Sequence, residues 1–318
     1  MADLKSWNLW HGCNKYSEGC DNCYMYYLDK VRGVPERARI VSKTSDFMKP
    51  LKKSRSGEYK IPSGYCLRVN MTSDTFLEEA DEWREDMWRM IKSRADIRFY
   101  ILTKRVPRIS DHLPADWGDG YENVDFNISC ENQRAFDERW PIFKNIPAKH
   151  KGLNLAPLIG GIDIMPALAS GQIEQVCLGG EGFGGQRPCR YEWIKQISDA
   201  CAEYKVNFTV NSIGAVFIKG GRTYYMEKQN VQGKQAYLSG LSHFYRKIPY
   251  KLFDPRDGHL LRDSELLIPQ YNKERCLTCT SSETCIGCVD CGACKNVELI
   301  TYEELVRLRS ERNNKIWK

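Results

Sequence analysis

Short apolar runs alternate with amphipathic segments along the first two thirds of the chain, and this alternation constrains the fold more than any other feature. The apolar runs predict strands over residues 65–71, 97–102, 124–130, 152–158, 174–179 and 206–210. Helical periodicity predicts helices over 76–93, 133–145 and 190–204. Strands separated by helices form parallel sheets with right-handed crossovers, so we expect an α/β fold built as a full or partial (β/α) barrel.

The alternation stops near residue 250, and this change predicts two domains. Residues 1–250 are expected to form the barrel domain, and residues 251–318 a cysteine-rich, metal-binding extension. The pattern over 298–309 predicts a helix that packs back to close the extension. Residues 52–64 and 217–235 are predicted to be exposed loops or a hairpin.

The composition excludes several classes of protein. The 318 residues include 47 Lys and Arg against 41 Asp and Glu, and the resulting net charge of +6 is too small to indicate a nucleic-acid or membrane partner. An apolar share of 42% is enough for a large core, which excludes a disordered chain. The sequence has no apolar run of about 18 residues and no signal-peptide pattern at its start. We therefore expect a cytoplasmic protein.

The chain contains 14 cysteines, and their distribution is uneven. In a reducing compartment, thiols serve more often as metal ligands or catalysts than as disulfides. Nine of the cysteines form two groups, one near each end of the chain. The other five are scattered in mostly apolar surroundings and are predicted to pack in the core: Cys66, Cys130, Cys177, Cys189 and Cys201.

The first group is Cys13, Cys20 and Cys23, spaced C-x6-C-x2-C in a loop that contains two glycines. Three thiolates can hold three irons of a [4Fe-4S] cluster and leave the fourth iron open. S-adenosylmethionine can bind an open iron, and one electron then cleaves it to a 5'-deoxyadenosyl radical. The alternative is a zinc site with His11 as the fourth ligand. The spacing alone leaves both possibilities open.

The second group lies near the carboxyl end, and its last four cysteines have the C-x2-C-x2-C spacing of ferredoxin-type cluster ligands. It favours either an auxiliary [4Fe-4S] cluster or a structural zinc ion. Since the segment has few apolar residues, we expect that it does not fold without its metal. The predicted ligands are Cys276, Cys279, Cys285, Cys288, Cys291 and Cys294.

Polar and glycine-rich clusters follow five of the predicted strands. The carboxyl ends of parallel strands lie at one edge of a sheet, so these clusters predict a ligand site there. Turns and helix N-caps prefer the same residue types, and any one cluster is equally well explained as a cap. The clusters are Thr72-Ser73-Asp74, Thr103-Lys104-Arg105, Glu131-Asn132, Gly179-Gly180-Glu181 and Asn211-Ser212.

Five motifs taken together resemble a family of phage and bacterial proteins of unknown function. That family resembles a branch of the radical S-adenosylmethionine superfamily in which the spacing of the three cysteines is widened. The resemblance covers roughly residues 7–215 and favours the iron–sulfur interpretation of the first cysteine group. The motifs are, in order, WNLWHGCNKYSEGCDNCY, VNMTSDTF, ILTKR, ISCENQ and LGGEGFGGQRP.

The resemblance implies roles for particular residues. Cys13, Cys20 and Cys23 would hold the cluster. Ser73 and Asp74 would meet the amino group of S-adenosylmethionine. Ser129 and Glu131 would face its ribose hydroxyls. An electron donor such as flavodoxin or ferredoxin is also implied.

One activity within that family is cleavage of the 7-deazaguanine base queuine to its 7-aminomethyl core, and this sequence resembles a candidate for that lyase. A pocket for such a base needs a carboxylate to accept from the ring N–H and the amine, and donors for the carbonyl oxygen. We predict Glu181 as the carboxylate and Arg105, Asn127 or Asn211 as donors.

Two other functions remain as alternatives. One is radical repair or modification of nucleic acid, similar to spore photoproduct lyase, although the sequence lacks a concentrated basic stripe. The other is a non-enzymatic binding protein held together by two zinc sites.

Overall fold

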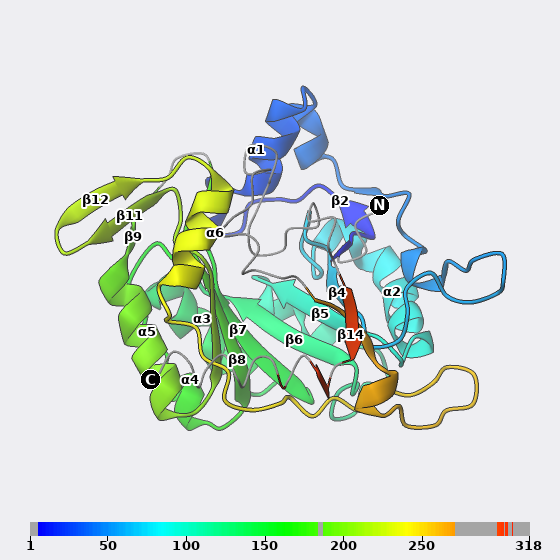
Figure 1. Cartoon of the computed structure of the whole chain (residues 1–318). Helices are drawn as coiled ribbons and strands as arrows, with labels where there is room; N and C mark the ends of the chain where they lie inside the picture. Colours follow the sequence, from blue (N-terminus) through cyan, green and yellow to red (C-terminus); the bar gives the residue numbers. More distant parts are fainter. Residues whose placement is uncertain (1–5, 184–186, 271–297, 302, 305–306, 308–318) are drawn as a thin grey trace.

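A parallel sheet of seven strands forms the centre of the computed structural model, which describes residues 6–183, 187–270, 298–301, 303–304 and 307 (Figure 1). The sheet curls into half a barrel, compatible with the expected partial (β/α) barrel. Its strands, in spatial order, are β1 (Ser6–Trp7), β4 (Cys66–Val69), β5 (Arg98–Thr103), β6 (Val124–Ser129), β7 (His150–Leu155), β8 (Ile173–Gly179) and β10 (Asn207–Ser212).

The apolar runs located six of these strands to within a few residues. Strand β1 was missed because it has only two residues, too few for any periodicity. It nevertheless extends the sheet at its edge, where Ser6 and Trp7 pair in parallel with Arg68 and Val69. Trp7 is fully buried and its ring packs against Phe99, with ring centroids 5.4 Å apart.

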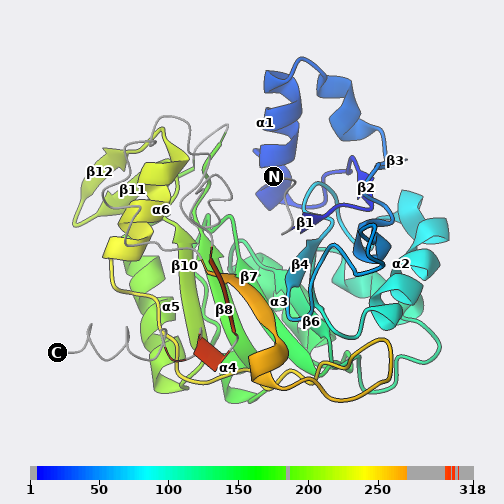
Figure 2. The same ribbon diagram turned by 45° about the vertical axis from the view of Figure 1, so that its right-hand side comes forward.

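Helices cover the outer face of the sheet (Figure 2). The three predicted helices are present as α2 (Asp81–Ser93), α3 (Gln133–Phe143) and α5 (Tyr191–Glu203), and α4 (Met165–Ala169) is a further short helix. On this face Phe126 of β6 contacts Phe76, Trp117 and Phe143. Successive side chains of a strand point to opposite faces, so the apolar residues of β6 fill the core between sheet and helices.

The concave face of the sheet is polar. On β6 the residues that alternate with the apolar set are Asp125, Asn127 and Ser129, and all three are buried. Barrel interiors are more often filled by branched apolar side chains. A buried polar row requires hydrogen-bond partners, so this face is suited to a polar ligand or a polar segment of chain.

A strap of irregular chain, residues 243–267, crosses the amino ends of the strands (Figures 1 and 2). It starts beside β10, where the Phe208 amide donates to the His243 carbonyl over 2.9 Å, and reaches the Ala95 carbonyl through the Phe253 amide at 3.1 Å. Between these points the Tyr250 hydroxyl lies 3.2 Å from Asp125 Oδ2. The expected domain boundary at residue 250 falls inside this strap, which closes one end of the half barrel.

The segment over 217–235 contains the expected hairpin, formed by β11 (Val216–Lys219) and β12 (Arg222–Tyr225), and β9 (Cys189–Arg190) adds a third strand to it. It also contains a helix that was not predicted, α6 (Gln229–Leu238). The remaining helices and strands are α1 (Tyr24–Val31), β2 (Trp10–His11), β3 (Ser42–Lys43) and the 3-10 turns Glu18–Cys20, Pro35–Arg39, Lys49–Leu51, Glu78–Ala80, Val106–Arg108, Ser110–His112 and Asp263–Glu265.

The helix predicted over 298–309 is wrong at its start. Residues Glu298–Thr301 form strand β14, which pairs antiparallel with β13 (Leu267–Gln270). The β-branched residues Ile300 and Thr301 favour an extended backbone, and the neighbouring strand supplies the hydrogen bonds.

The scattered cysteines divide into two sets. Cys130, Cys189 and Cys201 are buried in the core as predicted, and burial raises the pKa of each thiol to about 12. Cys66 on β4 and Cys177 on β8 are only partly buried. Among the described residues, no helix has the length and apolar character needed to cross a membrane.

Candidate functional site

The amino-terminal cysteine loop lies over the carboxyl ends of the strands, with α1 projecting above it (Figure 1). It is hydrogen-bonded to the segments that follow four different strands. The Gly12 amide donates to the Thr72 carbonyl, Arg105 donates to the Asn14 carbonyl, Ser17 donates to Glu131, and Asn22 donates to Glu181. The cysteine loop therefore covers the mouth of the half barrel.

Cys13, Cys20 and Cys23 are free thiols on this loop, and each is partly buried. Burial raises the pKa of Cys13 to about 12, with a further contribution from the Asp74 carboxylate, while the Arg105 guanidinium opposes the rise. Negative charge on Cys20 or Cys23 also raises the pKa of Cys13, so the three sulfur atoms lie in one electrostatic neighbourhood.

The separation of the three thiols bears on the metal that they fit. In the described part of the chain, the donor atoms found within 4.8 Å of one another are those of Asp254, Asp257 and His259, and the three thiols do not form such a group. Tetrahedral zinc holds its thiolates about 3.8 Å apart, given a Zn–S bond of about 2.3 Å. A [4Fe-4S] cube takes each thiolate on a separate iron and spreads them further. Three thiolates on one loop are a donor set that either metal can take.

His11, the fourth ligand in the zinc alternative, pairs with a carboxylate through one of its two ring nitrogens. Its Nε2 atom lies 2.6 Å from Asp29 Oδ2 on α1, and both side chains are buried. The pair joins the residue that precedes the cysteine loop to the helix that follows it. The pair fixes the two ends of the loop, and metal-bound histidines commonly donate their second ring N–H to a carboxylate in the same way.

Ser73 and Asp74 lie beside the cysteine loop at the end of β4. The Ser73 hydroxyl donates to the Gly12 carbonyl over 2.6 Å. Asp74 accepts from the Thr103 hydroxyl at 2.7 Å and from the amides of Phe76 and Lys104 at 2.9 and 3.0 Å. These bonds hold the Asp74 carboxylate in a fixed position within electrostatic range of Cys13.

Glu131 is fully buried at the end of β6. Arg139 of α3 donates to it over 2.8 Å, and Lys104 Nζ lies 3.6 Å away. Burial disfavours the charged form, but these two cations outweigh it and lower the pKa of Glu131 to about 2. A Cβ atom on Gly19 would lie 2.8 Å from the Glu131 carboxyl carbon, so glycine there allows the cysteine loop to approach. Ser129, two residues earlier, is buried on the concave face.

Arg105 contacts the cysteine loop directly. Its Nη1 atom lies 3.9 Å from the Cys13 sulfur, and Nη2 donates to the Asn14 carbonyl over 2.9 Å. Carboxylates on the other side hold the guanidinium, with Glu78 at 3.3 Å and Asp74 at 3.5 Å. The structure places this predicted substrate donor against Cys13.

Glu181 lies at the end of β8 and is buried. Arg187 donates to it from Nη2 at 2.7 Å, from Nε at 3.2 Å and from its amide at 2.7 Å, and Asn22 adds a bond of 3.1 Å. The carboxylate thus has protein partners on both oxygens and ties the segment after β8 to the cysteine loop.

The two predicted asparagine donors are placed differently. Asn127 is fully buried in the middle of β6, where its amide nitrogen donates to the carbonyl and carboxylate of Asp125, each over 3.0 Å. Asn211 is half-buried at an irregularity in the pairing of β10 with β8, between Val210 and Ser212. Such bulges turn a side chain away from the regular strand direction.

Sequence reasoning assigned no individual role to Lys104, Arg139, Asn154 or Arg187, although Lys104 stands in one of the predicted clusters and Arg187 in one of the motifs. Arg139 belongs to a segment with an ordinary surface pattern, and its partner Glu131 identifies it only in three dimensions. Asn154 was within reach, because the run V-D-F-N-I-S in β6 and the asparagine in β7 both place polar residues inside strands predicted to be buried.

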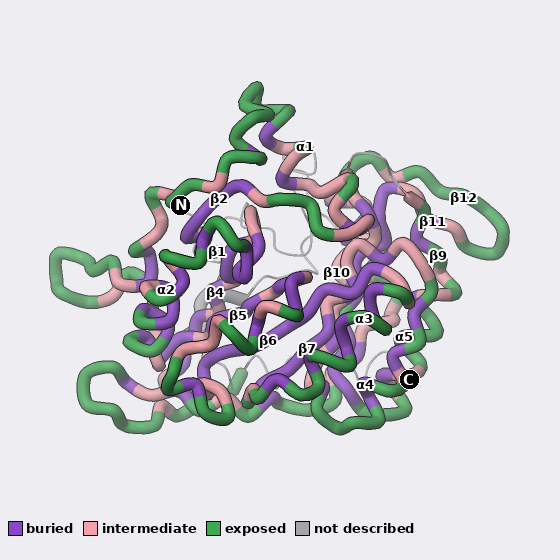
Figure 3. The backbone as a smooth tube through the Cα atoms, turned by 180° about the vertical axis from the view of Figure 1, so that it is seen from behind, coloured by how far each residue is buried: buried purple, intermediate pink, exposed green. Residues whose placement is uncertain are grey.

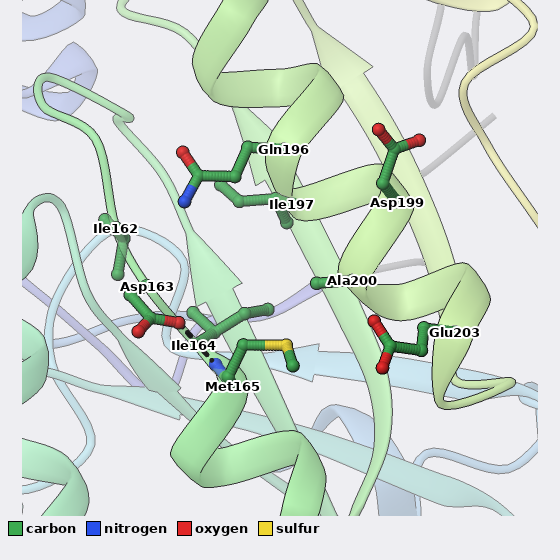
Figure 4. Close-up of a pocket in the computed structure, with 9 residues that line it drawn as sticks. All are labelled: Ile162, Asp163, Ile164, Met165, Gln196, Ile197, Asp199, Ala200 and Glu203. Atoms are coloured by element: carbon green, nitrogen blue, oxygen red, sulfur yellow. Dashed lines mark hydrogen bonds between the residues drawn. The ribbon is translucent and has the colours of Figure 1, made fainter.

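Two other features lie away from the mouth. A pocket of about 270 Å³ lies between α4 and α5. Figure 4 shows its lining residues, which include the apolar Ile164 and Ile197. The second feature is the cluster of buried Asp254 with exposed Asp257 and His259 on the strap, where Arg256 already donates to Asp254 at 2.7 Å. The six predicted carboxy-terminal ligands, Cys276 to Cys294, lie outside the described residues.

The fold and the site together define an α/β half-barrel protein that carries a three-cysteine loop over the carboxyl ends of its strands. The chain belongs to the family described as "Protein of unknown function (DUF5131)", whose model matches residues 3–248. That match includes the whole half barrel and the cysteine loop. No curated protein and no solved structure matches the chain.

Proposed function

We propose that this protein is a radical S-adenosylmethionine enzyme that cleaves a modified 7-deazaguanine base, with queuine as the expected substrate. The observation that carries the proposal is the position of Cys13, Cys20 and Cys23, which lie on one loop over the mouth of a half barrel with a polar concave face. A [4Fe-4S] cluster with S-adenosylmethionine at its open iron supplies a radical that removes hydrogen from a carbon of the substrate.

The three cysteines would hold the cluster, as the resemblance of the sequence motifs implies. Asp74 is fixed by its three hydrogen bonds and has lone pairs left to accept from the amino group of S-adenosylmethionine. Glu131 is kept ionised by Arg139 and Lys104. To meet a ribose hydroxyl, Glu131 would exchange the Ser17 hydroxyl for that of the cofactor. Ser129, on the same strand, would lie next to that ribose.

The substrate would lie against the concave face, between the cysteine loop and the strap. In this position the cysteine loop would exclude water from the reacting carbon. Breakage of the adjacent C–N bond would leave the unpaired electron on the nitrogen of the 7-aminomethyl core, and one electron from the electron donor together with one proton would complete that product. The predicted role of Glu181 requires the N–H groups of the base to displace Arg187. An electron donor such as flavodoxin or ferredoxin would reduce the cluster.

The experiment is anaerobic purification and reconstitution, followed by measurement of 5'-deoxyadenosine with queuine and, separately, with oligonucleotides. We expect bound iron and sulfide and queuine-dependent 5'-deoxyadenosine. Formation that depends on oligonucleotides instead would favour nucleic-acid repair or modification. Zinc without sulfide would remove the enzymatic proposal and leave the zinc-binding alternative.

A further inference from the structure

Several buried polar atoms on the concave face have no hydrogen-bond partner. In the described part of the chain, the side-chain atoms of this kind include Asn127 Oδ1, His150 Nε2 and Asn154 Oδ1. All three residues lie on the neighbouring strands β6 and β7. In register, Asp125 pairs with His150, Asn127 with Gly152, and Ser129 with Asn154, so the side chains share one face of the sheet.

The orientation of the Asn127 amide is fixed by its neighbour. Its nitrogen faces the Asp125 carboxylate at 3.0 Å, and a flipped amide would place an oxygen against that carboxylate. The Oδ1 atom must therefore point the other way, over Gly152, where a Cβ atom would lie 2.1 Å from it. The unpaired atom is therefore a hydrogen-bond acceptor. A buried acceptor without a donor destabilises the folded protein.

Asn154 is the diagonal neighbour of Asn127 on the next strand, one step nearer the mouth. Its amide nitrogen lies 3.3 Å from the Tyr100 hydroxyl, and its oxygen is unpaired. Two amide oxygens thus lie on adjacent strands of one polar wall, below the cysteine loop. A planar ligand with two neighbouring N–H donors on one edge would satisfy both.

We infer that Asn127 and Asn154 accept hydrogen bonds from a planar heterocycle that carries an amino group beside a ring N–H. This inference rests on the proposed function, which supplies the base. It assigns recognition of that base to Asn127 and Asn154 in place of Glu181. Glu181 already accepts from Arg187 and Asn22 on both oxygens. The two amide oxygens have no partner, so the N–H groups of the base can bind them without breaking an existing hydrogen bond.

The test is calorimetric binding of 7-deazaguanine and 7-deazahypoxanthine, which differ only in the amino group, to the reconstituted, unreduced protein. We expect the wild type to prefer 7-deazaguanine by about tenfold or more. Asn127→Leu and Asn154→Leu should each reduce that preference to near unity, with binding of S-adenosylmethionine unchanged. Asn145→Leu, on an exposed asparagine, is the matched control.

Equal binding of the two bases by the wild type, or an unchanged preference in Asn154→Leu, overturns the inference. If Asn127→Leu fails to fold, Asn154→Leu decides alone, because that side chain has a single hydrogen bond to lose. If Glu181→Gln loses the preference for 7-deazaguanine and the asparagine variants keep it, Glu181 is the residue that accepts from the base and the inference is overturned. Because no turnover is needed, a protein that binds 7-deazaguanine through these amides but forms no 5'-deoxyadenosine would contradict only the proposed reaction.

Discussion

Glu131 is a buried carboxylate whose charge depends on two cations from different segments. Arg139 comes from α3 and Lys104 from the end of β5. Removing one member of such a group leaves the others buried without a counter-charge, and this is the usual reason that buried ion pairs tolerate substitution poorly. The sequence placed Glu131 and Lys104 in clusters at the ends of strands but gave no indication of Arg139.

Glu131→Gln should lower the free energy of unfolding by about 3 kcal/mol at neutral pH. Since the folded protein lowers the pKa of Glu131 to about 2 from an ordinary value of 4.5, its stabilising charge is fully present above pH 4.5. That contribution is lost as the pH falls toward 2. Urea unfolding of both proteins across this range should therefore show a difference that narrows with acidification. Glu138→Gln, on the exposed face of α3, should show no comparable difference.

Arg105→Gln tests the contact with Cys13. The guanidinium brings a positive charge and an N–H group to 3.9 Å from the sulfur, and both stabilise extra negative charge at a cluster. We expect the midpoint potential of the reconstituted cluster to fall by tens of millivolts, on the order typical of such contacts. An electron paramagnetic resonance redox titration measures it. The control is Arg89→Gln, an exposed arginine on α2, and a shift of equal size there would contradict the assignment.

At the scale of elements, the cysteine loop is held in position by close contact between its backbone and the backbone of a neighbouring segment. The segment Pro35–Arg39 and the residue after it pack on the start of this loop, and Cys13 donates its amide to the Ala38 carbonyl over 3.0 Å. Gly12 has a φ of +93°, and a Cβ atom there would lie 2.4 Å from the Ile40 carbonyl oxygen. Figure 3 shows that this projecting region is mostly exposed, in contrast to the buried strands.

Gly12→Ala and Gly33→Ala form a matched pair. Both glycines have positive φ, but a Cβ atom on Gly33 would meet nothing within 4 Å. Gly33→Ala should cost only the backbone term, about 1 kcal/mol. Gly12→Ala should cost more and should also lower the iron retained per chain, because the loop cannot keep its position. Thermal unfolding and iron analysis measure both effects, and equal losses in the two variants would refute this account.

At the scale of the whole molecule, the regular elements were predictable and the connections between them were not. The strands from residue 65 to 210 follow from apolar periodicity, and the parallel order follows from the helices between them. The strap over 243–267 has no periodicity, so its passage under the strands could not be foreseen. The hydrogen bonds that join the cysteine loop to Glu131 and Glu181 span more than a hundred residues, and no local pattern encodes them.

The two cysteine groups should be separable by metal content. Replacing Cys13, Cys20 and Cys23 together with alanine should remove about four irons per chain, the content of one cluster. Replacing the six carboxy-terminal cysteines should remove either a second set of iron or one zinc ion, and should leave the first set in place. Elemental analysis after anaerobic reconstitution distinguishes these outcomes. Full iron retention in the triple variant would exclude the amino-terminal loop as a cluster site.

The sheet stops at β10 without hydrogen bonds to β1, within the part of the chain described here. A closed barrel fixes its radius through the number and stagger of its strands, and admits ligands only at its two ends. An open arc has no such constraint, because its two edge strands are not bonded to each other among the described residues. The segments between β10 and β1 therefore limit the size of the ligand. Relatives of this fold would come to accept larger or smaller ligands through changes in the length of those segments.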